Sequence, residues 1–345
     1  MWDNERRRQP MEQPAIAKRC ESIQLMRGMA ALSVVIFHIG MFANGRFGVD
    51  LFFCISGFIM MYTTEKSSEK FLLKRAVRIV PLYWAAIAVT SAMLLIAPQY
   101  FRSQELSAAH VIRSMLFIPS KVETNWSIVA VGWTLILEVF FYVIFYISMK
   151  ISFKNRHIIS GAVLILTAGA GQLLDGKTDS VIVEFYCRPV ILEFVLGMLL
   201  YTLLSGKKKK TAPKKYDIAL LILAGMLWLF LFGIKYIPFP DDLDRFYKYG
   251  IVTFFVFLLT FKYFENRKIP RPFIFLGDIS YSLYLTHTFI VQPFSRLIYN
   301  IDDFTPLGAV LSFFIVIPLC IFAAWICKVI IEDKFTAFLR AKLNI

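Results

Sequence analysis

A chain of 345 residues in which 58% are hydrophobic and only 18% are charged does not have the composition of a soluble globular protein. Soluble domains contain about 45–50% apolar and about 25% charged residues, and the mean hydropathy of +0.62 likewise indicates an integral membrane protein. The net charge of +14 does not indicate nucleic-acid binding, because membrane proteins collect Lys and Arg in their cytoplasmic loops.

Ten apolar segments follow one another along the chain, and a membrane helix needs roughly 20 such residues. Their ranges are 28–45, 48–62, 79–97, 128–148, 158–174, 189–205, 217–234, 249–264, 273–292 and 306–327. We therefore expect an all-α, polytopic transmembrane helix bundle of about ten helices. Its transmembrane domain would cover 25–330, between a cytoplasmic N-terminal segment (1–24) and a cytoplasmic tail (331–345).

The distribution of basic residues predicts the orientation. Of the 38 Lys and Arg residues, 28 fall in one alternating set of loops and 10 in the other, which favours cytoplasmic N- and C-termini. The four lysines at 207–210 fit this pattern as a topology signal. The loop 98–127 is the least regular part, and its residues 111–119 are expected to form an interfacial or re-entrant stretch.

Cysteine spacing and the polar N-terminus add two expectations. The five cysteines include no CxxC pair, so we expect neither a disulfide framework nor a metal site. The first 20 residues lack the cleavage signature of a signal peptide, so the first apolar run is expected to remain as a helix.

The first apolar segment carries an ionisable pair with helical spacing. His38 follows Arg27 by eleven residues, so both lie on one helix face, roughly 16 Å apart along the axis. An ionisable side chain inside the bilayer is costly and is by default a functional candidate. One face thus holds a cation at the cytoplasmic end and a titratable base in the outer half. The alternative is that His38 only bonds two helices together.

A second basic motif precedes the third segment. Arg75 and Arg78 form an RxxR pair beside Lys74, and i, i+3 spacing places both guanidiniums on one face, suited to a phosphate. The alternative is ordinary positive flanking of a membrane helix.

Two glutamates fall within apolar segments. Glu138 lies among aromatic and aliphatic neighbours, where it must be neutral or paired with a cation or a histidine. A Glu–His pair at this depth would orient and charge the imidazole. For Glu193, a structural pairing with Arg188 competes equally with a functional role.

Further polar residues stand near the outer surface. Ser280, Tyr284 and His287 are spaced i, i+4, i+7 and form one polar stripe, which would either line an acceptor cavity or hold helices together. Asp50 is either an N-cap at the outer surface or a partner for His38. Ser56 lacks the Gly-x-Ser-x-Gly context of a nucleophile and is better explained by close helix packing.

Six stretches of the sequence, which contain the residues discussed above, resemble the acyltransferase-3 family of membrane O-acyltransferases. The resemblance is strongest to the stand-alone type that O-acetylates exopolysaccharides. The matching stretches are LMRGMAALSVVIFH (25–38), FGVDLFFCISGFIM (47–60), FLLKRAVRIVPLYW (71–84), WTLILEVFFY (133–142), LEFVLGM (192–198) and LGDISYSLYLTH (276–287). They span nearly the whole chain in the family's order. The tail departs from many relatives, because no proline follows Glu332.

The resemblance implies specific roles for these residues. His38 would be the catalytic histidine, Arg75 and Arg78 would bind acyl-CoA, and Arg27 would support them. Glu138 and Asp50 match the family's acidic positions and are the candidates for stabilising the imidazolium of His38. The stripe of Ser280, Tyr284 and His287 is then the candidate for binding the acceptor.

The expected enzyme is an acyl-CoA-dependent O-acetyltransferase, multi-pass in the cell inner membrane and surrounded by its lipid. Acetyl-CoA would be the acyl donor, without a metal. The acceptor would be a polysaccharide or a lipid-linked oligosaccharide, and polysaccharide-export machinery is a further expected partner; nucleic acid is not. The histidine would act as a general base or form an acyl-histidine intermediate.

A rival hypothesis is a proton-coupled transporter or flippase of a sugar-linked lipid or small anion, which intramembrane His and Glu would also suit. The sequence shows no internal repeat, which disfavours an inverted-repeat transporter. A non-catalytic subunit of an export complex would leave the intramembrane charges unexplained.

Overall fold

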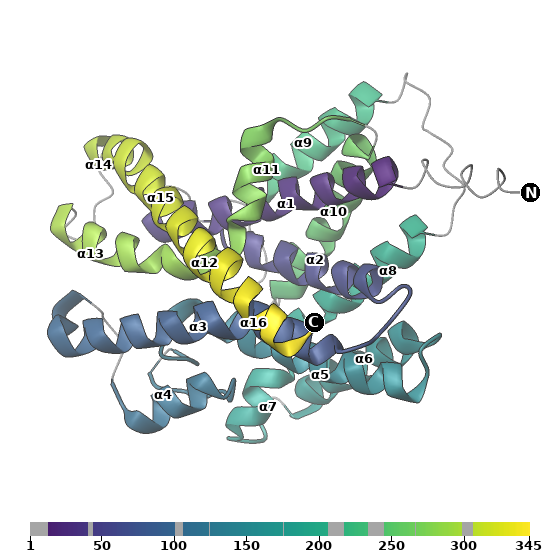
Figure 1. Ribbon diagram of the computed structural model, residues 1–345, viewed down its shortest axis with the longest axis horizontal. Helices are drawn as coiled ribbons and strands as arrows, with labels where there is room; N and C mark the ends of the chain where they lie inside the picture. The colour runs from purple at the N-terminus through teal and green to yellow at the C-terminus, as the bar shows by residue number, and fades with distance from the viewer. Residues whose placement is uncertain are drawn as a thin grey trace, which may run out of the picture.

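A computed structural model describes residues 13–40, 44–100, 106–123, 125–174, 176–205, 217–233, 245–265, 267–298 and 306–345. Within these ranges the chain is helical and contains no β-strand (Figure 1). The α-helices are α1 (Gln13–Ile39), α2 (Phe47–Thr63), α3 (Phe71–Ile96), α4 (Ala108–Met115), α5 (Trp133–Ile151), α6 (Arg156–Leu174), α7 (Val181–Tyr186), α8 (Leu192–Ser205), α9 (Asp217–Gly233), α10 (Ile251–Phe264), α11 (Arg271–Asp278), α12 (Ser280–Thr286), α13 (Thr288–Ile298), α14 (Pro306–Leu311), α15 (Ile317–Cys327) and α16 (Thr336–Leu343).

Short irregular helices join or extend these elements. One-turn 3-10 helices precede α5 and α8 at Ala130–Gly132 and Pro189–Ile191, and another, Pro98–Tyr100, follows α3. Wider π-helical turns occur at Phe246–Gly250, Ser312–Val316 and Lys328–Phe335. The last two are continuous with α15 and α16, so residues 312–343 form one long helix.

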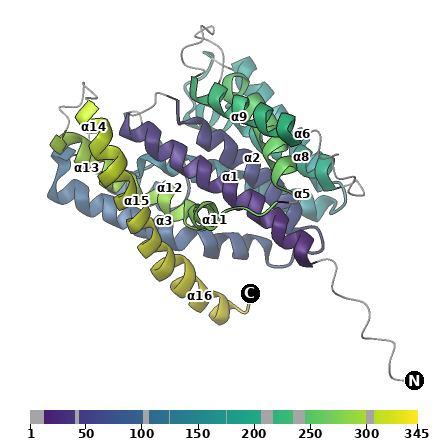
Figure 2. The same cartoon turned by 90° about the horizontal axis from the view of Figure 1, so that it is seen from above.

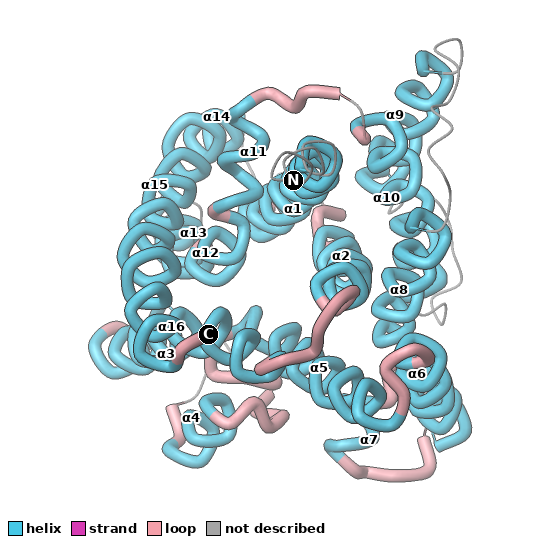
Figure 3. Tube along the Cα trace, turned by 45° about the vertical axis from the view of Figure 1, so that its right-hand side comes forward, coloured by secondary structure: helices cyan, strands magenta, loops and turns pink. Residues whose placement is uncertain are grey.

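Helices α1 and α2 form the centre of the bundle. They pack against each other, with α8 and α10 against α2, and α11 and α12 against α1. Figure 3 shows α1 and α2 nearly end-on between these two groups, and Figure 2 shows α15 and α16 crossing obliquely near α3. Among the described residues, a large buried cluster rich in Phe joins α1, α2, α8 and α10, and a second, smaller cluster packs α1 against α12 and α15. The two central helices are therefore the scaffold from which a site can be built.

Glycines allow the closest helix approach in this core, between α2 and α8. A Cβ atom at Gly197 would lie 2.0 Å from the carbonyl oxygen of Cys54, and one at Gly57 would lie 2.2 Å from that of Phe194. No side chain fits at these distances, so the two backbones pack directly, as small residues permit between membrane helices.

We expect Gly197→Ala to lower the free energy of unfolding by about 1–3 kcal/mol, because the new methyl group must push two helix backbones apart. The check is the thermal unfolding temperature of the purified protein in detergent. Gly169→Ala on α6 is the matched control, since a Cβ there meets nothing within 4 Å. Equal melting temperatures for the two variants would contradict this packing.

The prediction of an all-helical protein is confirmed, and each of the ten predicted apolar segments falls largely within helices. Five helices in the described part of the chain are long and apolar enough to cross a membrane, and a bent pair makes a sixth. They are Glu21–Ile39, Phe71–Ile96, Ala130–Ile151, Arg156–Leu174 and Ser312–Leu343, and the bent pair is Arg271–Asp278 with Ser280–Ser295. Three shorter apolar helices are Phe47–Thr63, Pro189–Ser205 and Ile218–Gly233.

Some charges used to predict the orientation lie outside the described residues. These are the arginines at 6–8 and 102 and the lysines at 207–210, 214, 215 and 235. The stretch 111–119 overlaps α4, whose His110 and Ser114 are buried while Ile112 is exposed.

Two elements differ from the predicted boundaries. Helix α3 begins at Phe71, eight residues earlier than expected, because the Phe71 ring packs against Tyr142, Phe145 and Tyr146 of α5. The predicted ninth helix is broken, with a bend of 56° between the segments ending at Asp278 and beginning at Ser280. The first change places the RxxR pair inside a helix.

Candidate active site

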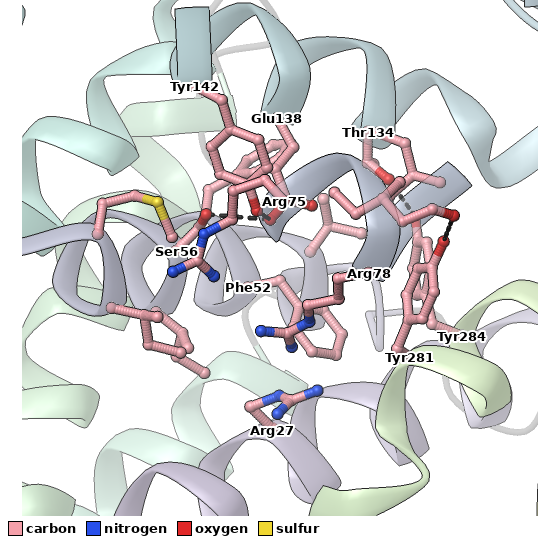
Figure 4. A pocket seen from close by; sticks show the side chains of 17 residues that line it. Arg27, Phe52, Ser56, Arg75, Arg78, Thr134, Glu138, Tyr142, Tyr281 and Tyr284 are labelled. Carbon is pink, nitrogen blue, oxygen red and sulfur yellow. Dashed lines mark hydrogen bonds between the residues drawn. The ribbon is translucent and has the colours of Figure 1, made fainter. Parts of the chain in front are cut away.

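One pocket is enclosed by α1, α2, α3, α5 and α12, at the centre of the bundle (Figure 4). The lining residues surround about 720 Å³ of space not filled by atoms, a volume that includes solvent at the opening of the pocket. Its lining is apolar except for Arg27, Ser56, Arg75, Arg78, Thr134, Glu138, Tyr142, Tyr281 and Tyr284.

Three guanidinium groups converge on this pocket. Arg75 and Arg78 come from the first two turns of α3, and Arg27 comes from α1 on the opposite side. Figure 4 shows the three side chains one below another, facing the same space. The structure thus brings Arg27 to the same pocket as the RxxR pair.

None of these three arginines forms an ion pair with a carboxylate in the described part of the chain. Arg27 donates to Gln24 at 3.1 Å, and Arg75 donates to the Thr63 hydroxyl at 2.7 Å. The Arg75 guanidinium also lies over the rings of Phe71 and Tyr142, at 5.7 and 5.9 Å. Three half-buried cations with no carboxylate at ion-pair distance among the described residues are suited to bind an anionic ligand.

Glu138 lies on the α5 side of the same pocket. Its Oε1 atom accepts hydrogen bonds from Ser56, at 3.1 Å, and from Tyr142 one helical turn later. These two donors hold the carboxylate in place facing the arginines. Within the described residues, Glu138 is therefore not bonded to a histidine, in contrast to the expected Glu–His pair.

His38 instead meets a second histidine. Its Nδ1 atom lies 3.2 Å from Nε2 of His287 and 2.9 Å from the carbonyl oxygen of Val34, and the two rings are 4.9 Å apart. His38 is exposed, whereas His287 is fully buried. The structure thus joins two residues that the sequence had placed at similar membrane depth.

Tyr284 connects the histidine pair to the pocket. Its ring lies 6.2 Å from the His287 ring and 5.6 Å from Phe52, which lines the pocket. Its hydroxyl group is held 3.0 Å from the Thr134 hydroxyl and 3.2 Å from the Val131 carbonyl. The histidines do not line the pocket directly, and Tyr284 forms the boundary between them and it.

Asp50 is held by an arginine that the sequence did not suggest. Its carboxylate is fully buried and receives two hydrogen bonds from Arg245, at 2.9 and 2.6 Å. Arg245 also donates to the carbonyl of Arg46 at the start of α2. Neither the N-cap bond nor the contact with His38 that we expected for Asp50 is present among the described residues.

The remaining candidates lie away from the pocket. Ser280 is buried, and its hydroxyl forms no hydrogen bond within the described part of the chain. Glu193 is fully buried on α8, while the Arg188 guanidinium lies over the Trp126 ring at 4.8 Å. Among the described residues, no cluster of three or more His, Cys, Asp or Glu side chains is arranged to hold a metal ion.

Sequence reasoning missed several polar residues of the site. Tyr142 could have been found, since it follows Glu138 by one helical turn. Tyr281 lines the pocket and donates to the carbonyl of Ile79, where α3 passes through the site. Arg245 lies 195 residues from Asp50 in the sequence, so no local sequence pattern indicates their contact.

Comparison with known proteins gives a consistent result. A family model described as "Acyltransferase domain" matches residues 21–328. The chain is 34% identical over 267 residues to the exopolysaccharide production protein ExoZ of Rhizobium meliloti (strain 1021), covering 74% of this chain and 79% of that protein. It is 24% identical over 298 residues to the putative membrane-bound transacylase BcsY of Komagataeibacter xylinus, covering 78% and 72%. No solved structure matches.

Proposed function

This chain belongs to the membrane acyltransferase family defined by that domain, and on this premise we propose that it moves an acetyl group from cytoplasmic acetyl-CoA to a hydroxyl group of an exopolysaccharide or its lipid-linked precursor. The observation that carries the proposal is the cluster of three arginines, none paired with a described carboxylate, at a central pocket. The function of ExoZ in exopolysaccharide production supports a polysaccharide acceptor.

The proposed membrane arrangement has about ten spans in the cell inner membrane, with both termini in the cytoplasm. The catalytic domain covers 25–330, with cytoplasmic segments at 1–24 and 331–345. The excess of Lys and Arg in alternating loops supports this orientation. It places Arg27 and the RxxR pair at the cytoplasmic end, where acyl-CoA is available.

The donor would bind with its phosphates on Arg27, Arg75 and Arg78. Arginine presents a fork of N–H donors that fits phosphate oxygens, and such charge-assisted bonds are about twice as strong as neutral ones. The apolar part of the pocket would then hold the pantetheine arm. Its thioester would extend past Tyr284, at the boundary of the pocket, to reach the histidine pair beyond it.

His38 would act as the general base. Its imidazole takes the proton from the acceptor hydroxyl, whose oxygen forms a bond to the thioester carbonyl carbon. The carbon–sulfur bond then breaks, and the imidazolium returns the proton to the CoA thiolate. The products are an acetyl ester and free CoA, with no metal required by the balance of this step.

The acidic residues would act by position. Glu138 faces the arginines at the pocket, where it would direct their guanidiniums towards the phosphates. Asp50 would support the site through Arg245 and the start of α2, as a structural partner and without direct contact to His38. Tyr284 would contact the donor or acceptor at the boundary of the pocket, and Ser280 would belong to the packing behind it.

We expect the purified protein in detergent to transfer label from [14C]acetyl-CoA to deacetylated exopolysaccharide as an alkali-labile ester. In sealed proteoliposomes with an imposed pH gradient, an uncoupler should leave the transfer rate unchanged, because no ion gradient enters the chemistry. Boiled protein and polymer without free hydroxyl groups are the controls. Movement of a sugar-linked lipid that collapses with uncoupler, without ester formation, would instead favour the transporter.

A further inference from the structure

In the contact between His38 and His287, each imidazole ring is also hydrogen-bonded to the backbone of its own helix. Each ring directs its Nδ1 atom to the carbonyl oxygen four residues earlier on its own helix: Val34 for His38, at 2.9 Å, and Leu283 for His287, at 3.1 Å. The Nε2 atom of His287 then lies 3.2 Å from Nδ1 of His38. Phe37 packs edge-on against the His38 ring at 5.1 Å and fixes it further.

These contacts determine where the protons are. A backbone carbonyl only accepts, so Nδ1 of each imidazole carries its hydrogen. A neutral imidazole has a single ring proton, so both Nε2 atoms carry a lone pair. Nε2 of His287 therefore accepts from Nδ1–H of His38, which is shared with the Val34 carbonyl. The lone pair at Nε2 of His38 is left available.

Exposure decides which histidine reacts. His287 has no exposed surface, whereas His38 is exposed near the end of α1. An acceptor hydroxyl can therefore approach the His38 ring but not the His287 ring. His287 can act only through its neighbour.

We infer that His287 is the positioning residue of the reaction: it accepts the Nδ1–H of His38, holds His38 in the tautomer with a basic Nε2, and stabilises the imidazolium formed when Nε2 takes the acceptor proton. This inference rests on the proposed function. It changes the expected role of His287, which the polar stripe had suggested as a residue for binding the acceptor.

The positive charge that forms on His38 in this step is stabilised by hydrogen bonds to acceptors on its own helix and on the helix of His287. When the hydroxyl proton moves to Nε2, the positive charge spreads over the His38 ring, and Nδ1–H becomes a stronger donor to His287 and Val34. When the proton passes to the departing CoA sulfur, His38 returns to its starting tautomer. His287 keeps its own proton on Nδ1 throughout, because the Leu283 carbonyl holds it there.

The test compares two amides at the same buried position. In His287→Gln the side-chain oxygen reaches approximately to the place of Nε2 and can accept from His38, whereas in His287→Asn it ends near the place of Nδ1 and cannot. We expect His287→Asn to lower kcat by about 10- to 100-fold, the range for one hydrogen bond to a charged group, with an unchanged KM for acetyl-CoA. His287→Gln should restore most of kcat.

Wild type and His38→Ala are measured beside these variants by [14C]acetyl transfer, with melting temperature and acetyl-CoA binding as checks of folding. A near-normal kcat in His287→Asn, or an equal loss of kcat in both folded amide variants, would overturn the positioning role of His287. The His38→Ala variant tests the assignment of the base independently. If His287→Asn does not fold, the decision rests on His287→Gln: a folded Gln variant with kcat as low as that of His38→Ala overturns the role. Absence of transfer in folded wild type would instead reject the proposed function.

Discussion

Replacing His38 with alanine is expected to slow acetyl transfer at least about 100-fold, while acetyl-CoA binding stays within about two-fold of wild type. General bases contribute about 10²- to 10⁴-fold to the rate, and the residual rate reflects only the bound donor and acceptor. Binding is kept because His38 does not line the pocket that contains the arginines. The measurement is steady-state [14C]acetyl transfer together with equilibrium binding of acetyl-CoA.

His157→Ala supplies the matched control, since it also removes a histidine but lies near the start of α6 and does not line the pocket. It should transfer acetyl groups at nearly the wild-type rate. If His38→Ala matched it, the base would have to be sought elsewhere. A loss of acetyl-CoA binding in His38→Ala would contradict the separation between the donor pocket and the histidine pair.

The second large effect is expected in the double variant Arg75→Ala/Arg78→Ala, which should bind acetyl-CoA at least about 100-fold more weakly. A hydrogen bond to a charged group contributes about 1.5–3 kcal/mol, and two lost arginines exceed the 2.7 kcal/mol that corresponds to 100-fold. Isothermal titration in detergent measures the dissociation constant directly. Replacement of both residues by lysine should give intermediate binding, because it keeps the charge but loses the planar fork.

Lys74→Ala is the control for charge alone. Lys74 precedes Arg75 on α3, but it is exposed and does not line the pocket. Its replacement should weaken binding by less than about two-fold, as expected for an exposed charge in water. A similar loss of affinity in Lys74→Ala and in the double arginine variant would mean that the general basic surface, and not the pocket, attracts the donor.

Helical spacing predicted much of the site. The shared face of Arg27 and His38 and the i, i+3 pairing of Arg75 and Arg78 are properties of one helix, so the sequence contains them. The boundary of α3 was wrong because its positive charges were taken for a loop. The rings that fix the start of α3 come from α5, more than 70 residues later, and no local pattern reports them.

The sequence could not predict which side chains on different helices contact each other. The carboxylate of Asp50 and its arginine are 195 residues apart, and the two histidines are 249 residues apart. Ionisable residues in apolar segments indicate that partners exist, because an unpaired charge is costly there, but they do not identify the partner. The expected Glu138–His38 pair failed for this reason: Ser56 and Tyr142 satisfy Glu138, and His287 meets His38.

The bend before α12 was also not predictable from hydropathy, since the apolar run continues through it. It follows from packing: a Cβ at Gly277 would lie 2.2 Å from the Gln24 carbonyl of α1, and the Gln24 side chain donates to Asp278 at 2.7 Å. The chain is thus tied to α1 just before α12 changes direction. This tie brings Tyr284 and His287 beside α1 and α5.

The most direct measurement of the central claim is acetyl-CoA binding and slow hydrolysis, side by side, in wild type, His38→Ala and Arg75→Ala/Arg78→Ala. The proposed enzyme predicts that the arginine variant loses both binding and hydrolysis, while the histidine variant binds normally and loses hydrolysis. A folded wild-type protein that transfers no acetyl group and does not bind acetyl-CoA at all would contradict it.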